Sequence, residues 1–186
     1  MDKKEFGTFC YLYPIPSVLM GAVVDGKPNY ATYGNCGIIS MEPCAIYVSS
    51  VQSHYTNKGV RESGVFSVNV PSAKQAVETD YCGIVSGKDV DKSSVFRSFY
   101  GKTGAPMIEE CPVNLECKLV KTVEIFGMDV FIGEVINCYV NSECLTNDSP
   151  DMMKIDPIIY DIGNVYRSFS GLNAPSFKIG EEYKPE

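Results

Sequence analysis

Three segments of the chain combine residue types that could together hold a flat, phosphorylated cofactor. Thr32-Tyr33-Gly34-Asn35 offers small side chains and backbone amides suited to the edge of a ring. Ser49 to Thr56 runs from a predicted strand end into a predicted helix start, where free N–H groups, hydroxyls and the helix dipole favour an anion. Ser86-Gly87-Lys88, followed by Lys92, places two ammonium groups on a polar loop that could close over a phosphate.

Each of these segments also has a simpler structural explanation, and the residues alone leave both open. The first could be a tight turn, the second a plain helix cap and the third a solvated loop.

The chain lacks the motifs of several common enzyme classes. His54 is its only histidine, and a Ser-His-Asp relay needs three converging groups, so we interpret His54 as a surface or capping residue. Neither a Gly-x-x-x-x-Gly-Lys-Ser/Thr phosphate loop nor a Gly-x-Gly-x-x-Gly turn is present. If the protein is an enzyme, we expect an added cofactor to carry the chemistry, and we name no catalytic residue.

Composition predicts one ordinary globular domain. The 186 residues are 45% hydrophobic and carry 16 Lys+Arg against 23 Asp+Glu, a formal net charge of −7. This acidic balance argues against a nucleic-acid-binding surface. The apolar stretch Val18–Val24 is far short of the roughly 20 residues that span a bilayer, and no cleavage site follows it. We therefore expect a cytoplasmic protein with no membrane contact.

The eight cysteines are expected to be reduced and buried as small hydrophobic residues. The chain has no Cys-x-x-Cys, and the nearest pairs are separated by five residues, which is too wide for a typical structural zinc site. We therefore expect no metal.

Periodicity predicts several strands joined by short turns, with helices between them, which is typical of a β-barrel or an α+β domain. Turns are expected at Asp25-Gly26 and Gly127-Met128. The predicted helices run from a Ser53 cap to Ser63-Gly64 and from a Ser72 cap to about Tyr81. The predicted strands are 18–24, 44–51, 65–70, 113–126 and 129–144, with short ones at 157–160 and 165–167.

Short motifs follow one another along the chain in a fixed order. They are Pro14-x-Pro-Ser-Val18, Gly26-Lys-Pro-Asn29, Ser40-x-x-Pro43, Val48-Ser49 with His54-Tyr55-Thr56, Phe66-Ser-Val-Asn-Val-Pro71, Asp80 to Lys92, Cys111 to Leu119, Phe131-Ile-Gly-Glu-Val135 and Tyr160-Asp161. This order resembles the flavin reductase-like, FMN-binding split-barrel family, and is most similar to its flavoredoxin branch. The resemblance extends from about Pro14 to Gly180.

The resemblance implies a mainly β (α+β) fold, a Greek-key split β-barrel of six strands with short helices between them. It implies a single domain over residues 1–186, with a core at about 14–145 and a C-terminal extension at about 146–186. It further implies a homodimer with FMN bound non-covalently near the subunit interface.

The family's cofactor-binding positions carry over residue by residue. The edge of the isoalloxazine would be formed by Thr32, Tyr33, Gly34 and Asn35, and the segment beneath the ribityl chain by Ser49, Ser50 and Val51. The phosphate would be held by Tyr55 and Thr56 together with Ser86, Lys88 and Lys92. Cys36 is the thiol expected nearest the flavin, and we expect it to be inert.

Two departures from the family bear on how the flavin is reduced. Many relatives have a His-Thr pair where this chain has Met128-Asp129, and that histidine lies near the flavin or the incoming nicotinamide. The flavoredoxin branch often carries Arg where this chain has Val51. Both changes put efficient reduction by NAD(P)H in doubt.

The leading functional hypothesis is an electron-transfer protein that works through bound FMN, with another redox protein or NAD(P)H as the electron donor. The alternative is an NAD(P)H:flavin oxidoreductase that uses flavin as an exchanging substrate. A second alternative is a split barrel that binds a ligand without redox chemistry. The Met128 departure favours the carrier.

Overall fold

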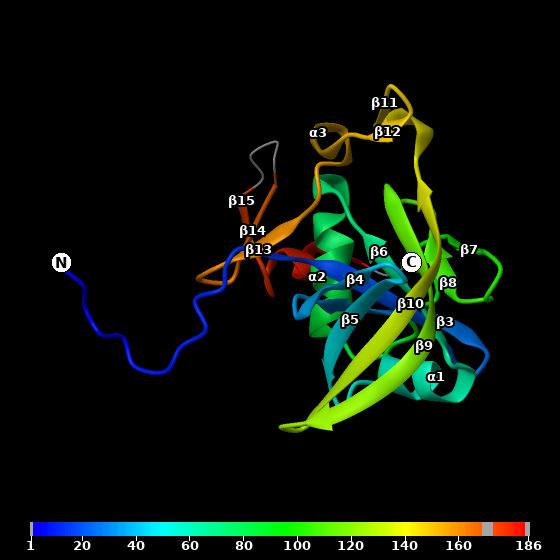
Figure 1. The fold of residues 1–186 in the computed structure, drawn as a ribbon, viewed down its shortest axis with the longest axis horizontal. Coiled ribbons are helices and arrows are strands. Elements are labelled where there is room, and N and C mark those ends of the chain that lie inside the picture. Colours follow the sequence, from blue (N-terminus) through cyan, green and yellow to red (C-terminus); the bar gives the residue numbers. More distant parts are fainter. Residues whose placement is uncertain (1, 169–172, 185–186) are drawn as a thin grey trace.

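The computed structural model describes residues 2–168 and 173–184 of the chain. Its main sheet holds seven antiparallel strands in the order β3-β2-β6-β9-β10-β5-β4 (Figure 1). The end strands β3 and β4 do not pair with each other, so the barrel is open. The strands are β2 (Val18–Val24), β3 (Lys27–Tyr33), β4 (Cys36–Met41), β5 (Cys44–Val51), β6 (Val65–Val70), β9 (Val113–Ile125) and β10 (Met128–Val140).

The mainly β fold with short helices is confirmed, although the sheet has seven strands where the resemblance implied six. The segment after Gly26, where no strand was predicted before residue 44, forms both β3 and β4. Gly34 and Asn35 separate the two strands, and each pairs with a different neighbour, β3 with β2 and β4 with β5. The predicted turn at Asp25-Gly26 is present, and both residues adopt positive φ.

Smaller elements surround the main sheet. A four-stranded sheet in the order β1-β13-β14-β15 joins the start of the chain to its C-terminal part. Strand β10 ends at Val140, so the predicted extension to Cys144 is wrong, and 142–144 form a 3₁₀ turn. These elements are β1 (Ile15–Pro16), β7 (Ser98–Tyr100), β8 (Pro106–Ile108), β11 (Leu145–Thr146), β12 (Ser149–Pro150), β13 (Ile159–Asp161), β14 (Val165–Arg167), β15 (Asn173–Pro175), α3 (Met152–Ile155) and 3₁₀ turns at Ala73–Gln75 and Ile179–Glu182.

Helix α1 (Thr56–Ser63) begins later than predicted. Its N-cap is Tyr55, with no side-chain cap, so the prediction of Ser53 as the cap is wrong. The chain first makes a turn in which the His54 N–H donates to the Val51 carbonyl at 3.0 Å, and this turn moves the helix start by two residues. The end is as predicted, because Gly64 adopts the left-handed conformation there.

Helix α2 (Ala76–Ile84) follows a capping box in which Ser72 and Gln75 bind each other's backbone, as the Ser72 prediction requires. The helix continues past its predicted end at about Tyr81 and takes in Gly83 and Ile84. Figure 1 shows α2 beside β13 and β14. Ala76 of α2 packs there against Ile158 and Tyr166 in a small apolar cluster.

The main core lies on the inner face of the sheet, beneath α1. Val60 of α1 is fully buried there with Met20, Phe66 and Phe131. Burial of such side chains contributes about 1.5–3 kcal/mol each. This packing holds α1 against β2, β3 and β6.

The eight cysteines are all free, and the expectation that they are buried holds for only part of them. Cys36 is half-buried, and three others are exposed because they lie on the N-terminal arm or on outward-facing strand positions. The buried thiols are Cys82, Cys111, Cys117 and Cys144, and the exposed ones are Cys10, Cys44 and Cys138. Within the described residues, no helix is both long and apolar enough to cross a membrane.

Gly59 sets how closely α1 approaches β2. A Cβ at this position would lie 2.3 Å from the Val23 carbonyl oxygen and 2.9 Å from a Val24 methyl group. Gly59→Ala should therefore destabilise the fold by about 1–3 kcal/mol. This loss is expected even though alanine stabilises an unhindered helix by about 1 kcal/mol relative to glycine. Urea unfolding measures this, with exposed Glu62→Ala in the same helix as the control. A Gly59→Ala variant as stable as the wild type would show that α1 is not held this closely.

Candidate functional site

Two cavities share one wall between β3, α1 and α2. The first, of about 250 Å³, is called the basic cavity, and Tyr55, Thr56, Ser86 and Lys92 lie in its lining. The second, of about 380 Å³, is called the aromatic cavity, and its lining includes Tyr13, Tyr160, Tyr166 and Phe177 together with Gly34 and Asn35. Thr32, His54 and Gly83 line both.

Lys92 places a buried positive charge in the basic cavity. The residue is only 3% exposed, and its Nζ donates to the carbonyl oxygens of Cys82 and Val85, both at 3.2 Å. Burial lowers the pKa of Lys92. In the described part of the chain no carboxylate pairs with it. A buried ammonium that has only carbonyl partners favours an anionic ligand.

The loop that carries Lys92 packs tightly against α1 and β3. A Cβ on Gly87 would lie 2.2 Å from Asn29 Oδ1 and 2.6 Å from a ring carbon of Tyr55, so this approach requires glycine. Asn29 Nδ2 also donates to Thr56 Oγ1 at 2.7 Å. Gly87, Tyr55 and Lys92 also line a neighbouring cavity of about 250 Å³, so they lie between the two.

The start of α1 offers fewer free backbone groups than the sequence predicted. The N–H groups of His54, Asn57 and Lys58 already donate to the carbonyls of Val51, His54 and Tyr55. The anion-binding character of this end therefore comes mainly from Lys92 and from the hydroxyl groups.

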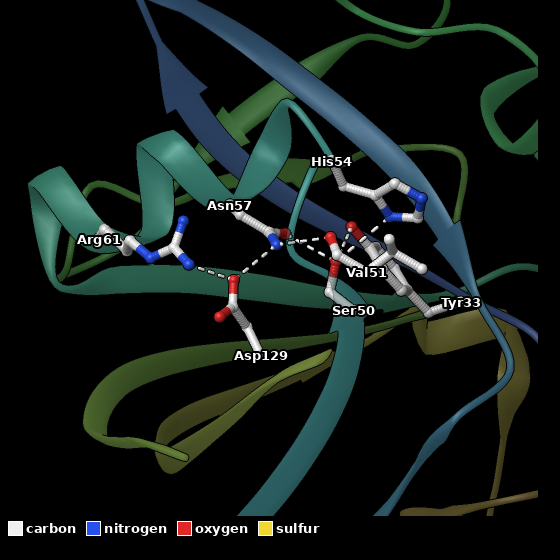
Figure 2. Close-up of polar contacts among 7 residues, drawn as sticks. All are labelled: Tyr33, Ser50, Val51, His54, Asn57, Arg61 and Asp129. Atoms are coloured by element: carbon white, nitrogen blue, oxygen red, sulfur yellow. Dashed lines mark hydrogen bonds and ion pairs between the residues drawn. The ribbon is translucent and has the colours of Figure 1, made fainter. Parts of the chain in front are cut away.

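A polar network lies behind the shared wall (Figure 2). Ser50, which is buried, lies 2.7 Å from Asn57 Oδ1, 3.1 Å from the Tyr33 hydroxyl and 3.2 Å from His54 Nδ1. Asn57 Nδ2 donates to Asp129 Oδ2 at 3.0 Å, and Arg61 forms an ion pair with the same carboxylate. The network thus joins β3, β5, α1 and β10.

The structure places the predicted cofactor-binding residues in two groups. Thr32, Gly34, Asn35, Tyr55, Thr56, Ser86 and Lys92 line the basic or the aromatic cavity, and Lys88 lines a third cavity beside the basic one. The other four line none of these three cavities. Tyr33 and Ser50 belong to the polar network, Ser49 donates its N–H to the Asn35 carbonyl at 2.7 Å, and the side chain of Val51 is exposed.

Sequence reasoning missed several residues of the site. His54, which we interpreted as a surface or capping residue, does remain open to solvent, but it lines both cavities. Tyr160, Tyr166 and Phe177 come from the C-terminal part of the chain, and only the Tyr160-Asp161 motif pointed to that part. Cys36 lines neither cavity, and burial raises its pKa to about 11, so the thiol stays protonated at neutral pH.

Partial burial lowers the pKa of His54, and the nearby Lys92 ammonium lowers it further. We expect the single histidine signal in an NMR titration to have a midpoint below the ordinary value of about 6.5. Lys92→Met should raise this midpoint, because it removes a positive charge that opposes protonation. A wild-type midpoint above about 6.5 would contradict this placement of His54 beside Lys92.

The two departures noted in the sequence lie opposite each other. Met128, the first residue of β10, pairs across the sheet with Val51, the last residue of β5. Val51 is 43% exposed. Asp129 points to the other face and is fully buried. An apolar pair therefore stands where the resemblance places an arginine and a histidine.

The sequence profile of the flavin reductase like domain family matches residues 10–167. The chain belongs to this family. Its flavoredoxin resemblance is confirmed by two solved structures. The flavoredoxin from Methanosarcina acetivorans is 37% identical with a TM-score of 0.88, over 97% of this chain and 98% of that one. The flavoredoxin of Desulfovibrio vulgaris (Miyazaki F) is 32% identical with a TM-score of 0.84, over 96% of this chain and 100% of that one.

A more distant relative of this flavin reductase-like protein carries a named activity. The ferric-chelate reductase (NAD(P)H) of Archaeoglobus fulgidus is 29% identical over 125 residues, which cover 62% of this chain and 71% of the relative. Together these comparisons identify a flavin-binding redox protein with a split-barrel fold.

Proposed function

We propose that the protein binds FMN non-covalently in the basic and aromatic cavities and transfers electrons through it as a flavoredoxin-type carrier. The observation that carries this proposal is the buried Lys92 ammonium in a cavity that shares its wall with an aromatic one. FMN has the matching order of parts: a flat apolar ring, a hydroxylated chain and a terminal phosphate. When bound, FMN supplies the capacity to accept and release electrons.

The residues of the two cavities would hold these parts in turn. The ring would lie in the aromatic cavity, with Gly34 and Asn35 at its edge. The hydroxylated chain would cross the shared wall at Thr32 and His54. The phosphate would lie against Lys92, within reach of the Ser86 and Thr56 hydroxyl groups that line the basic cavity.

The carrier and reductase alternatives differ in the electron donor that reduces the flavin. The NAD(P)H named for the Archaeoglobus relative supports the reductase alternative. The apolar Met128–Val51 pair supports the carrier, because it offers no charged or polar side chain to an incoming nicotinamide.

An anaerobic titration of the FMN-loaded protein distinguishes the two. We expect the flavin absorption to persist with NADH or NADPH and to bleach with dithionite. Rapid bleaching by either nucleotide would show a reductase instead. A protein that binds FMN but is not reduced by dithionite would support the non-redox binding alternative.

We also propose a homodimer, a single domain over residues 1–186 and a cytoplasmic location. The end strand β4 supports the dimer, since its Ile38, Ile39 and Met41 side chains are exposed and an unpaired apolar edge favours association. Sedimentation at micromolar concentration should give a dimer. A monomer there would count against this part of the proposal.

A further inference from the structure

Asp129 and the Val51 carbonyl together fix the orientation of the Asn57 side chain. Asn57 Nδ2 lies 3.0 Å from Asp129 Oδ2 and 3.0 Å from the Val51 carbonyl oxygen. The ion-paired carboxylate and the carbonyl can only accept hydrogen bonds, so the nitrogen of the amide must face them. Asn57 Oδ1, which also can only accept, therefore faces Ser50.

The orientation of Asn57 decides where the Ser50 hydroxyl proton goes. Ser50 has one proton, and Asn57 Oδ1 is its nearest acceptor at 2.7 Å. The Val51 carbonyl lies farther away, at 3.4 Å, and already accepts from the His54 N–H and from Asn57 Nδ2. Ser50 therefore donates to Asn57 and has only lone pairs left for its other neighbours.

One of those neighbours is the ring of His54. Its Nδ1 lies 3.2 Å from Ser50 Oγ, and a hydrogen bond there requires Nδ1 to carry the proton (Figure 2). In a neutral imidazole the other nitrogen, Nε2, is then an acceptor. Within residues 2–168 and 173–184 Nε2 has no hydrogen-bond partner. Because the His54 side chain lines both cavities, this acceptor is available to their contents.

We propose that Asn57, locked by Asp129 and the Val51 carbonyl, is a positioning residue that fixes neutral His54 as its Nδ1–H tautomer. His54 Nε2 then accepts a hydrogen bond from a hydroxyl group of the cofactor's polyol chain. The tautomer follows from the hydrogen bonds alone, whereas the hydroxyl partner rests on the proposed function.

Nitrogen NMR of the protein labelled with ¹⁵N-histidine tests the tautomer directly, because His54 is the only histidine. At a pH where the ring is neutral, the flavin-free wild type should show a protonated Nδ1 and an unprotonated Nε2. In Asn57→Ala the Ser50 hydroxyl is free to donate to Nδ1, so the proton should move to Nε2. Ser50→Ala, which removes the acceptor, should also lose the Nδ1–H preference.

Asn114→Ala is the matched control. Asn114 is another buried amide, which donates to Asn69 Oδ1 and the Ile108 carbonyl away from His54. This variant should leave the tautomer unchanged even if it is equally destabilised. An Nε2–H ring in the wild type, or an unchanged tautomer in folded Asn57→Ala or Ser50→Ala, would overturn the proposal.

Binding titrations test the second half of the proposal separately. Asn57→Ala should weaken FMN and riboflavin by the same factor, roughly fivefold, because both carry the polyol chain. Equal wild-type and variant affinities would overturn the assignment of the hydroxyl partner. If no flavin bound even to the wild type, the proposed function would be wrong. The tautomer assignment would still be decided by the nitrogen NMR experiment alone.

Discussion

Lys92→Met is expected to weaken FMN binding roughly 10- to 150-fold while leaving riboflavin binding almost unchanged. Lys92 is buried and lines the basic cavity, and a charge-assisted hydrogen bond from its ammonium to a phosphate there would be worth about 1.5–3 kcal/mol. Methionine keeps most of the side-chain volume and removes the charge. Riboflavin lacks the phosphate, so it reports any damage to the ring and chain positions. Fluorescence titration of both flavins measures the effect.

Lys88→Ala provides the comparison on the same loop. Lys88 is exposed and lines the neighbouring cavity rather than the basic one. Solvent screens an exposed charge, so this variant should lose less than about fivefold in FMN affinity. If Lys92→Met bound FMN as tightly as the wild type, the phosphate position would be wrong. If Lys88→Ala had the larger effect, the phosphate would instead lie towards the neighbouring cavity.

Asp80→Asn is expected to destabilise the protein by about 2–4 kcal/mol and to weaken flavin binding. The Asp80 carboxylate is fully buried in α2 and accepts from the Tyr166 hydroxyl at 3.0 Å, from the Gly180 N–H at 2.8 Å and from the Phe177 N–H. An asparagine in its place has one acceptor oxygen and turns an N–H group towards a donor. Urea unfolding and flavin titration measure the two effects.

Both effects have the same physical cause. Tyr166 and Phe177 line the aromatic cavity, so loosening the C-terminal segment from α2 removes part of the wall. Asp161→Asn is the control, because it disrupts an exposed pair with Arg167 and should cost no more than about 1 kcal/mol. An Asp80→Asn variant as stable as the wild type would show that this carboxylate does not hold the C-terminal segment.

Three strands of the main sheet could be predicted with their bounds because their signals are local. Val18–Val24, Cys44–Val51 and Val65–Val70 are found with the predicted bounds, since each is rich in β-forming residues and ends at a turn residue or a proline. The start of α1 could not be placed from Ser53, because the intervening turn depends on a hydrogen bond to the Val51 carbonyl. Helix α2 also ends later than its local pattern indicates.

The site was only partly predictable because its parts are distant in the sequence. Lys92, Ser86 and Thr56 were found from residue type and from the resemblance. The sequence contains no signal that Ser50 turns inward to Asn57 and Asp129, because that contact depends on the pairing of β5 with β10. The aromatic wall at Tyr166 and Phe177 likewise depends on the hydrogen bonds that these two residues donate to Asp80 of α2.

The most direct test of the central claim is the visible absorption spectrum of the purified protein, with the released flavin then identified. We predict a flavin band at near-stoichiometric occupancy and FMN as the released flavin. A protein that carries no flavin and shows no spectral change on addition of FMN would contradict the account.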